Sequence, residues 1–454
     1  MDLAIVGSGS GNSLLTDYWD GKQVAIAESG VFGGTCLNVG CIPTKMFVRP
    51  AQLARTYQEA SRVGVALPAG RADFSAIRDR IFERIDPISA GGLEYRQQAA
   101  NVTVLGHVDL LDEHTLRCAD GREIHAEQIV LAAGSRPVLP EIQGINLPGV
   151  HTSDTIMRIE QPQKLVVIGA GFIACEFASI FAGLGTEVTQ LVRGDRLLKY
   201  LDEDIGRAFN QQVDWEVKLN SEPRSITAGQ TGLQVHTDTG IFTADAVLVA
   251  TGRLPNTEFT AGAGLDLHAD GRLKVDQFQR VLRGGQAVQG LYALGDISGE
   301  QQLKHAANHQ ARVVAHNLEN PQNLRAVSSG AVPAAVFTHP EIAHIGLTEA
   351  QARAQVGEHV TVKTQKYADT AYGWAMEDEQ GLCKVIADRR DGRILGAHIL
   401  GYEAANLIQP LVTAMNLGID AHTLARGAYW IHPALMEVVE NALLGLEVPD
   451  SGCL

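Results

Sequence analysis

The sequence predicts an α/β protein with two Rossmann-like dinucleotide-binding domains followed by a C-terminal α+β domain. Two observations predict the first two domains: an apolar strand runs into a glycine-rich turn at residues 2–12, and the same pattern returns at residues 164–174. The third observation concerns the sequence after Val332, which predicts short strands and turns but contains no further glycine-rich nucleotide motif. The predicted domains are 1–140 with 256–330, then 141–255, and then 331–454.

The individual elements follow from the alternation of apolar runs with turn residues. We expect a helix after each glycine turn, since that helix would point backbone N–H groups at a bound phosphate. In the first half, the sequence predicts strands at 2–6 and 24–28, a domain crossing at 129–134, a strand at 164–168, a helix that ends at Leu184, a strand at 187–193 and a second crossing at 247–252. In the second half, it predicts a helix that ends near Asn317, a hairpin formed by 382–387 and 394–399, and a helix at 404–417 that Pro410 interrupts.

Charge and hydropathy exclude two classes of partner. The 454 residues include 37 Lys and Arg against 52 Asp and Glu, a formal net charge of −15. No basic run could neutralise a phosphate backbone, which argues against nucleic acid. The sequence has no basic-then-apolar leader and no unbroken stretch of about 20 apolar residues. We therefore expect a cytoplasmic protein without a membrane segment.

The first glycine turn carries the features of a nucleotide site. Gly7 and Gly9 allow a tight turn and a close approach of the backbone to a pyrophosphate, and Glu28 lies 21 residues on, where an acid can accept from a ribose hydroxyl. Asn12 replaces the third glycine. One such match is weak by itself, but two in one chain are a much stronger indication.

The second glycine turn, with Gly169, Gly171 and Ala174, leads to a strand with a different end. That strand ends at Arg193 in place of an acid, and Arg196 and Lys199 come close behind. Basic side chains at this point suit a 2′-phosphate, so the sequence favours NADPH over NADH. The alternative is an exposed basic turn with no ligand.

Cys36 and Cys41 form the most informative pair in the sequence. In a regular helix, cysteines five apart would be separated by about 7.5 Å along the axis, beyond the ~7 Å Cα limit for a disulfide. A bridge therefore requires a distorted turn, which Gly40 can supply, and strained disulfides are the reducible ones. This favours a catalytic pair. Two inert thiols are the alternative, and metal binding is not expected because no CxxC or nearby His completes the ligands.

The other cysteines and one histidine carry weaker signals. Cys118, Cys175 and Cys383 fall in strand or helix patterns typical of inert core thiols, and Cys453 is interpreted as an incidental tail residue. His432 precedes Pro433, which predicts an extended residue before a helix that begins at the proline. Glu437 would then lie one turn in, within reach of the ring. Such a His, taken alone, is usually structural.

The stretch Gly33–Lys45 resembles the redox-active signature of the pyridine-nucleotide flavoprotein disulfide reductases, the group of glutathione reductase, lipoamide dehydrogenase and mercuric reductase. The resemblance covers the whole chain. It includes five further regions, at 132–136, 250–253, 292–296, 332–340 and 432–437, and within the family the segments 7–13, 43–48, 371–378 and 429–433 most resemble the mycothione reductases.

The resemblance implies FAD in the first glycine site, with Glu28 on the ribose and Asp296 near the pyrophosphate, and NADPH in the second. Lys45 and Glu176 match the family's ion pair beside the flavin, although Thr44 stands where glutathione reductases carry a second lysine. The full set of cofactor-binding residues expected is Gly7, Gly9, Ser10, Gly11, Glu28, Gly34, Thr35, Lys45, Ala133, Gly134, Gly169, Gly171, Ile173, Arg193, Lys199, Gly252, Arg253 and Asp296.

The resemblance also implies a homodimer with an active site shared between subunits. Cys36 would attack a small-molecule disulfide, Cys41 would face the flavin as a charge-transfer thiolate, and His432 of the partner subunit, oriented by Glu437, would protonate the leaving thiol. The expected activity is NADPH-dependent reduction of a low-molecular-weight disulfide, mycothione on the subfamily resemblance. The alternatives are a dihydrolipoamide dehydrogenase or another reductase of the family, and, in a different class, a flavin-binding electron carrier without a disulfide substrate.

Overall fold

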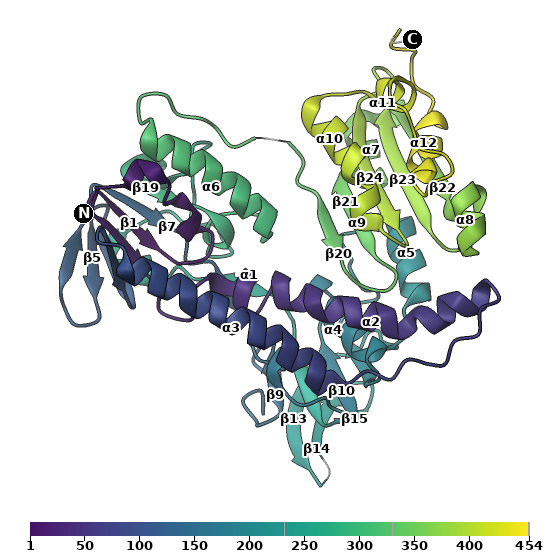
Figure 1. Ribbon diagram of the computed structural model, residues 1–454, viewed down its shortest axis with the longest axis horizontal. Coiled ribbons are helices and arrows are strands. Elements are labelled where there is room, and N and C mark those ends of the chain that lie inside the picture. Colours follow the sequence, from purple (N-terminus) through teal and green to yellow (C-terminus); the bar gives the residue numbers. More distant parts are fainter. Residues whose placement is uncertain (231, 329, 453–454) are drawn as a thin grey trace.

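The computed structural model describes residues 1–230, 232–328 and 330–452 and confirms the predicted fold class (Figure 1). The first sheet has six strands in the order β18-β19-β7-β1-β2-β3, parallel except for the β18–β19 pair. It unites strands from distant parts of the chain. They are β1 (Leu3–Val6), β2 (Val24–Ala27), β3 (Val102–Leu105), β7 (Gln128–Leu131), β18 (Arg280–Arg283) and β19 (Gln286–Ala293). The three-stranded antiparallel sheet beside it comprises β4 (Val108–Asp112), β5 (Thr115–Cys118) and β6 (Glu123–His125).

A second parallel sheet repeats the arrangement, with five strands in the order β12-β11-β10-β16-β9. These are β9 (Val150–Thr152), β10 (Lys164–Ile168), β11 (Glu187–Leu191), β12 (Glu216–Lys218) and β16 (Ala246–Val249). A three-stranded antiparallel sheet accompanies it: β13 (Pro223–Gly229), β14 (Gly232–Thr237) and β15 (Ile241–Ala244). Two paired antiparallel strands, β8 (Ser135–Pro137) and β17 (Arg253–Pro255), flank this region, and each directly follows one of the segments, 129–134 and 247–252, that the sequence predicted as crossings.

The third sheet is antiparallel, in the order β20-β21-β24-β23-β22. Its strands are β20 (Ala334–Val336), β21 (Ile342–Gly346), β22 (Val360–Lys366), β23 (Leu382–Asp388) and β24 (Ile394–Leu400). The predicted hairpin is therefore present as β23 and β24. The predicted helix at 404–417 is broken at Ile408, two residues before Pro410, into α9 (Ala404–Leu407) and α10 (Gln409–Leu417). Pro410 lies in the first turn of α10, where a missing N–H costs nothing.

The remaining helices cover the sheets and join them. They are α1 (Gly34–Asn38), α2 (Cys41–Arg62), α3 (Phe74–Gln98), α4 (Phe172–Gly183), α5 (Glu203–Gln212), α6 (Lys304–Glu319), α7 (Glu349–Val356), α8 (Ala371–Met376), α11 (Ala421–Gly427) and α12 (Glu437–Leu444). The long helices α2 and α3 pack together between the first sheet and the second (Figure 1). Within the described residues, no helix has the length and apolarity that a membrane crossing would need.

The prediction of a helix after the first glycine turn is wrong. A 3₁₀ segment, Gly11–Leu14, stands there, whereas the second turn does lead into a full helix, α4. Small polar side chains explain the difference, since they compete with the helix for backbone hydrogen bonds: the Ser13 hydroxyl donates to the Ser10 carbonyl, and Asn12 accepts from Arg96 of α3.

Three buried aromatic rings fix α2 against its neighbours. Phe47 of α2 lies 5.5 Å from Phe74 of α3, which lies 5.6 Å from Phe181 of α4. Arg55, farther along α2, is buried; its guanidinium donates to Asp214 at 2.6 Å and to the Ser179 carbonyl. These contacts hold α2 against α3 and α4.

A cluster of charges around the buried pair Lys384 and Asp202 links the third sheet to α5. Lys384 of β23 is only 2% exposed, and its ammonium group lies 2.8 Å from Asp202, which is 2% exposed, and 2.7 Å from both Asp204 and Glu349. Asp202 also caps α5 and accepts from the backbone N–H of Glu349. We call these four residues the Lys384 cluster.

Candidate active site

The first glycine turn is shaped for close approach of a ligand to the backbone. Gly7 has a φ of +107°, and a Cβ there would lie 2.3 Å from the Ala132 carbonyl oxygen at the end of β7, so only glycine fits. The turn is held open by Glu28, at the end of β2. Its carboxylate accepts from the N–H of Ser8 at 3.0 Å, from the Ser8 hydroxyl at 2.6 Å and from the N–H of Gly30 at 2.8 Å.

Cys36 and Cys41 lie on two different helices, as the five-residue spacing required. Cys36 is in α1 and Cys41 begins α2, and between them Gly40 leaves the helical conformation with φ −128° and ψ −123°. The two side chains are free thiols joined by a hydrogen bond. That bond lowers the pKa of Cys36 to about 7, with a further contribution from the charge of Lys304, and raises the pKa of Cys41. The hydrogen bond from Cys41 therefore favours the thiolate form of Cys36.

Lys45 and Glu176 are brought to the same place but do not form the ion pair that we expected. Lys45, one turn after Cys41 on α2, lies over the Phe337 ring at 3.6 Å and 3.7 Å from the Glu341 carboxylate. Glu176 of α4 instead accepts from the backbone N–H of Phe337 at 2.9 Å. Burial raises the pKa of Glu176 to about 7, while the Phe337 N–H and the charge of Lys45 oppose that shift. The loop after β20 thus supplies a partner to each residue.

Arg253, Ser135 and Asp296 form a polar chain where the two crossing strands meet. The Ser135 hydroxyl donates to Asp296 at 2.6 Å and accepts from the Arg253 guanidinium at 2.8 Å. Arg253 also donates to the Ser135 carbonyl and lies 3.7 Å from Asp154. This chain holds one oxygen of Asp296 in place and leaves the carboxylate at the wall of a large cavity.

That cavity, of about 1830 Å³, connects all of these features. It exceeds the roughly 300–1,000 Å³ of ordinary ligand pockets, and its wall joins the glycine turn, the thiol pair and the start of α4. FAD fits this description, since a dinucleotide needs a backbone cradle at one end and room for a ring system at the other. Of the predicted residues, the lining includes Gly7, Gly9, Ser10, Glu28, Gly34, Thr35, Cys36, Cys41, Lys45, Ala133, Gly134, Ile173, Glu176, Arg253 and Asp296, but not Gly11, Gly169, Gly171, Arg193, Lys199, Gly252, His432 or Glu437.

The second glycine turn copies the first. Gly169, after β10, has a φ of +138°, and a Cβ there would lie 2.2 Å from the Ala250 carbonyl oxygen at the end of β16. Gly171 precedes α4 as its N-cap. Arg193 is exposed beyond β11 and forms no hydrogen bond or ion pair with the described residues, while Lys199 pairs with Asp195 at 2.7 Å.

His432 and Glu437 lie together, away from the thiols. The His432 Nδ1 atom is 3.7 Å from the Glu437 carboxylate, and the His432 side chain is 69% exposed. The expected helix start is wrong: α12 begins at Glu437, so the residues from Pro433 form turns and Glu437 is the first helical residue. In Figure 1, α12 lies on the side of the third domain far from α1. One chain alone therefore does not bring His432 to Cys36.

The remaining cysteines have no access to this chemistry. Cys118, Cys175 and Cys383 are buried free thiols, and burial raises the pKa of Cys175 and of Cys383 to about 12. Cys453 lies outside the described residues. The sequence interpretation missed Lys304, Glu341 and Phe337, which all contact site residues. Lys304 left one signal: a lysine in the first turn of a helix, where a positive charge opposes the helix dipole.

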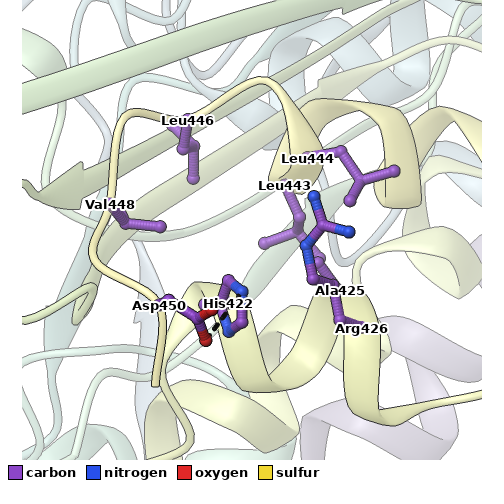
Figure 2. Close-up of a pocket in the computed structure, with 8 residues that line it drawn as sticks. All are labelled: His422, Ala425, Arg426, Leu443, Leu444, Leu446, Val448 and Asp450. Atoms are coloured by element: carbon purple, nitrogen blue, oxygen red, sulfur yellow. Dashed lines mark ion pairs between the residues drawn. The ribbon is translucent and has the colours of Figure 1, made fainter. Parts of the chain in front are cut away.

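A second, smaller cavity of about 360 Å³ lies in the third domain, between α11, α12 and the segment that comes after α12 (Figure 2). His422 and Asp450 point toward each other there, 3.5 Å apart, and the apolar side chains of Leu443, Leu446 and Val448 line the same cavity. None of the predicted site residues lines it. No group of three or more His, Cys, Asp or Glu side chains placed to hold a metal ion occurs within the described ranges.

Comparison with known proteins agrees with the geometry. Residues 1–311 match the family described as pyridine nucleotide-disulphide oxidoreductase, and residues 332–443 match its dimerisation domain, which supports a homodimer. The mycothione reductase of Mycobacterium tuberculosis H37Rv is 48% identical over 98% of this chain and 99% of its own. A glutathione reductase of Nostoc is 30% identical over 96% and 98%.

Among solved structures, the HOCl-induced flavoprotein disulfide reductase RclA of Escherichia coli superimposes with a TM-score of 0.85 at 28% identity, over 98% of this chain and 100% of its own. The family of mycothione and glutathione reductases uses FAD and NAD(P)H. The resemblance seen in the sequence is thus confirmed along the whole chain, which belongs to the pyridine nucleotide-disulphide oxidoreductase family and is an oxidoreductase acting on a disulfide.

Proposed function

We propose that the protein is an NADPH-dependent FAD enzyme that reduces mycothione to mycothiol. One observation supports mycothione as the substrate. The chain is 48% identical to mycothione reductase but only 30–32% identical to glutathione reductases and dihydrolipoyl dehydrogenases over similar lengths. The choice of NADPH rests on Arg193. Its exposed and unpaired guanidinium beyond β11 suits a charge-assisted contact with a 2′-phosphate.

The proposal assigns the cofactors to the two glycine turns. Gly7 and Gly9 would let the FAD pyrophosphate approach the backbone, Glu28 would accept from its ribose, and Asp296 would lie near the linking chain. Gly169 and Gly171 would do the same for NADPH. When bound, FAD accepts electrons from NADPH and returns them to the Cys36–Cys41 disulfide.

The thiol chemistry then belongs to this chain's own residues. The Cys36 thiolate, favoured by its lowered pKa, attacks one sulfur of the substrate disulfide, forms a mixed disulfide and expels the first thiolate. The Cys41 thiolate then attacks the Cys36 sulfur, which releases the second thiol and closes the Cys36–Cys41 disulfide. Two electrons pass from the pair to the substrate.

Each expelled thiolate needs a proton, and we assign it to His432 of the partner subunit. Glu437 lies 3.7 Å from the His432 ring, close enough to orient it. The separation of α12 from α1 within one chain supports a site completed by dimerisation. Three buried free thiols fit a reducing compartment such as the cytoplasm.

The test compares substrates and nucleotides with one purified sample of holoenzyme. Mycothione, glutathione disulfide and lipoamide are each assayed with NADPH and with NADH, by following nucleotide oxidation and thiol release. We expect the highest kcat/KM with mycothione and NADPH. Faster turnover of lipoamide with NADH would favour a dihydrolipoamide dehydrogenase, and nucleotide oxidation without thiol release from any of the three would favour an electron carrier.

A further inference from the structure

Lys304 is a cation in the large cavity that no carboxylate neutralises. It is the first residue of α6 and is half-buried, and its ammonium group donates to the Ser10 hydroxyl of the first glycine turn at 2.9 Å. Of the other Lys and Arg residues of the cavity, Lys45, Arg136 and Arg253 each have a carboxylate partner, while Arg312, farther along α6, is exposed and has no carboxylate partner among the described residues. Within the described residues, Lys304 has no carboxylate within ion-pair distance, so its charge is available to another anion.

The Cys36 thiolate is an anion of the same cavity on which Lys304 acts. The charge of Lys304 lowers the pKa of Cys36, after the larger effect of the Cys41 hydrogen bond and against the effect of burial. Glu176 of α4 acts on the other thiol, Cys41, whose pKa it raises, and Lys45 of α2 lines the same cavity. Glu176 thus opposes a second thiolate, whereas the charge of Lys304 favours the first one, at Cys36.

The helix reinforces the side chain. Lys304 begins a helix of 16 residues, and Leu303 before it provides no side-chain cap, so the free N–H groups of the first turn add positive potential at the same wall of the cavity. A lysine is disfavoured at this end of a helix, because its charge repels the helix dipole. Its presence against that preference is consistent with a role toward an anion.

We propose that Lys304 is an electrostatic positioning residue of the redox centre, whose ammonium group stabilises the Cys36 thiolate and the negative charge of the reduced flavin bound in the same cavity. Ser10 holds the ammonium group in place through its hydroxyl. The inference rests on the proposed function in one respect, the assignment of Cys36 as the reactive thiol, and it holds for any disulfide substrate.

The test measures the reactivity of Cys36 without a disulfide substrate. FAD-bound protein, reduced with dithiothreitol and freed of it, is alkylated with iodoacetamide between pH 5.5 and 9, and the label on Cys36 is quantified by peptide mass spectrometry. Lys304→Met should move the midpoint of the profile up by about one pH unit, which lowers the rate at pH 7 about fivefold. Lys304→Arg should keep the wild-type profile, and Lys366→Met, an exposed lysine of β22, is the matched control.

A second readout is the reduction potential of the bound flavin, measured by equilibration with a reference dye. We expect a more negative potential in Lys304→Met and an unchanged one in Lys304→Arg. A Lys304→Met profile that matches the wild type overturns the thiolate role, and an unchanged potential overturns the flavin role. If Lys304→Arg behaves like Lys304→Met, charge is not the cause and the inference is wrong. A shifted profile in a protein that reduces no disulfide would instead refute the proposed function alone.

Discussion

Removing the ammonium group of Lys384 should destabilise the protein, because the buried carboxylate of Asp202 loses its positive partner. Lys384→Met keeps the length of the side chain but leaves Asp202, 2% exposed, without a positive partner. Breaking a buried ion pair in this way costs about 3–5 kcal/mol. Asp202 keeps hydrogen bonds from two backbone N–H groups, so we expect about 3 kcal/mol. Asp204 and Glu349 are better solvated and should add little.

The loss should depend on pH with a definite sign. Burial alone would raise the pKa of Asp202, but the Glu349 N–H and Lys384 outweigh it, so its pKa in the folded wild type is lowered. Its contribution to stability is therefore present above about pH 4 and is lost as the pH falls through the folded pKa. In Lys384→Met the ammonium group no longer opposes the effect of burial, so the folded pKa rises above the unfolded value and the penalty shrinks as the pH falls. The deficit should be smaller at pH 5 than at pH 8.

Urea unfolding of the FAD-bound protein at a fixed protein concentration measures this deficit at both pH values. The double variant Lys384→Met with Asp202→Asn removes the orphaned charge and should recover most of the loss, while Lys366→Met controls for the loss of a surface lysine. A deficit below about 1 kcal/mol at pH 8, well under the cost of an unpaired buried charge, would refute the reasoning. So would a deficit equal at pH 5 and pH 8, or a double variant no more stable than the single one.

Three further predictions concern turnover. Cys36→Ser should keep bound FAD and its reduction by NADPH while disulfide turnover disappears; near wild-type thiol release would contradict the role of Cys36. Arg193→Glu should shift the kcat/KM ratio from NADPH toward NADH by at least about tenfold, because a charge-assisted contact of ~1.5–3 kcal/mol is replaced by repulsion; equal KM values for both nucleotides in the wild type would count against it. His432→Gln should lower disulfide turnover about 10²–10⁴-fold with flavin reduction unchanged, and co-expression with Cys36→Ser should restore one site per mixed dimer, so inactive mixed dimers would disprove a shared site.

The sheets were predictable because their signals are local. The apolar runs at β1 and β10, each followed by glycines, and the hairpin of β23 and β24 around a turn are readable within about ten residues of sequence. The break between Cys36 and Cys41 was likewise predictable, since the spacing itself excludes a continuous helix for a reactive pair.

The rest depended on residues far apart in the chain. Lys45 was matched with Glu176, but the loop after β20 brings Glu341 to the lysine, almost 300 residues later in the sequence. Ser10 and Lys304 are 294 residues apart, and no local pattern links them. The wrong prediction of a helix after the first glycine turn also has a distant cause, because Arg96 of α3 donates to Asn12 in the 3₁₀ segment that forms there. Pairings of this kind follow from the packing of domains, which the order of residues alone does not reveal.

The paired strands β8 and β17 have a consequence for the assembly of the first sheet. In the first sheet, the neighbouring strands β7 and β19 are separated by roughly 150 residues of sequence. About 115 of these residues lie between β8 and β17, which pair with each other. While the intervening segment is unfolded, joining β7 to β19 closes a long, disordered loop. Once that segment has folded with its two ends side by side, the effective loop shrinks to about 40 residues, and the entropic cost of closure falls by about 1 kcal/mol. Prior folding of the segment between β8 and β17 therefore favours completion of the first sheet.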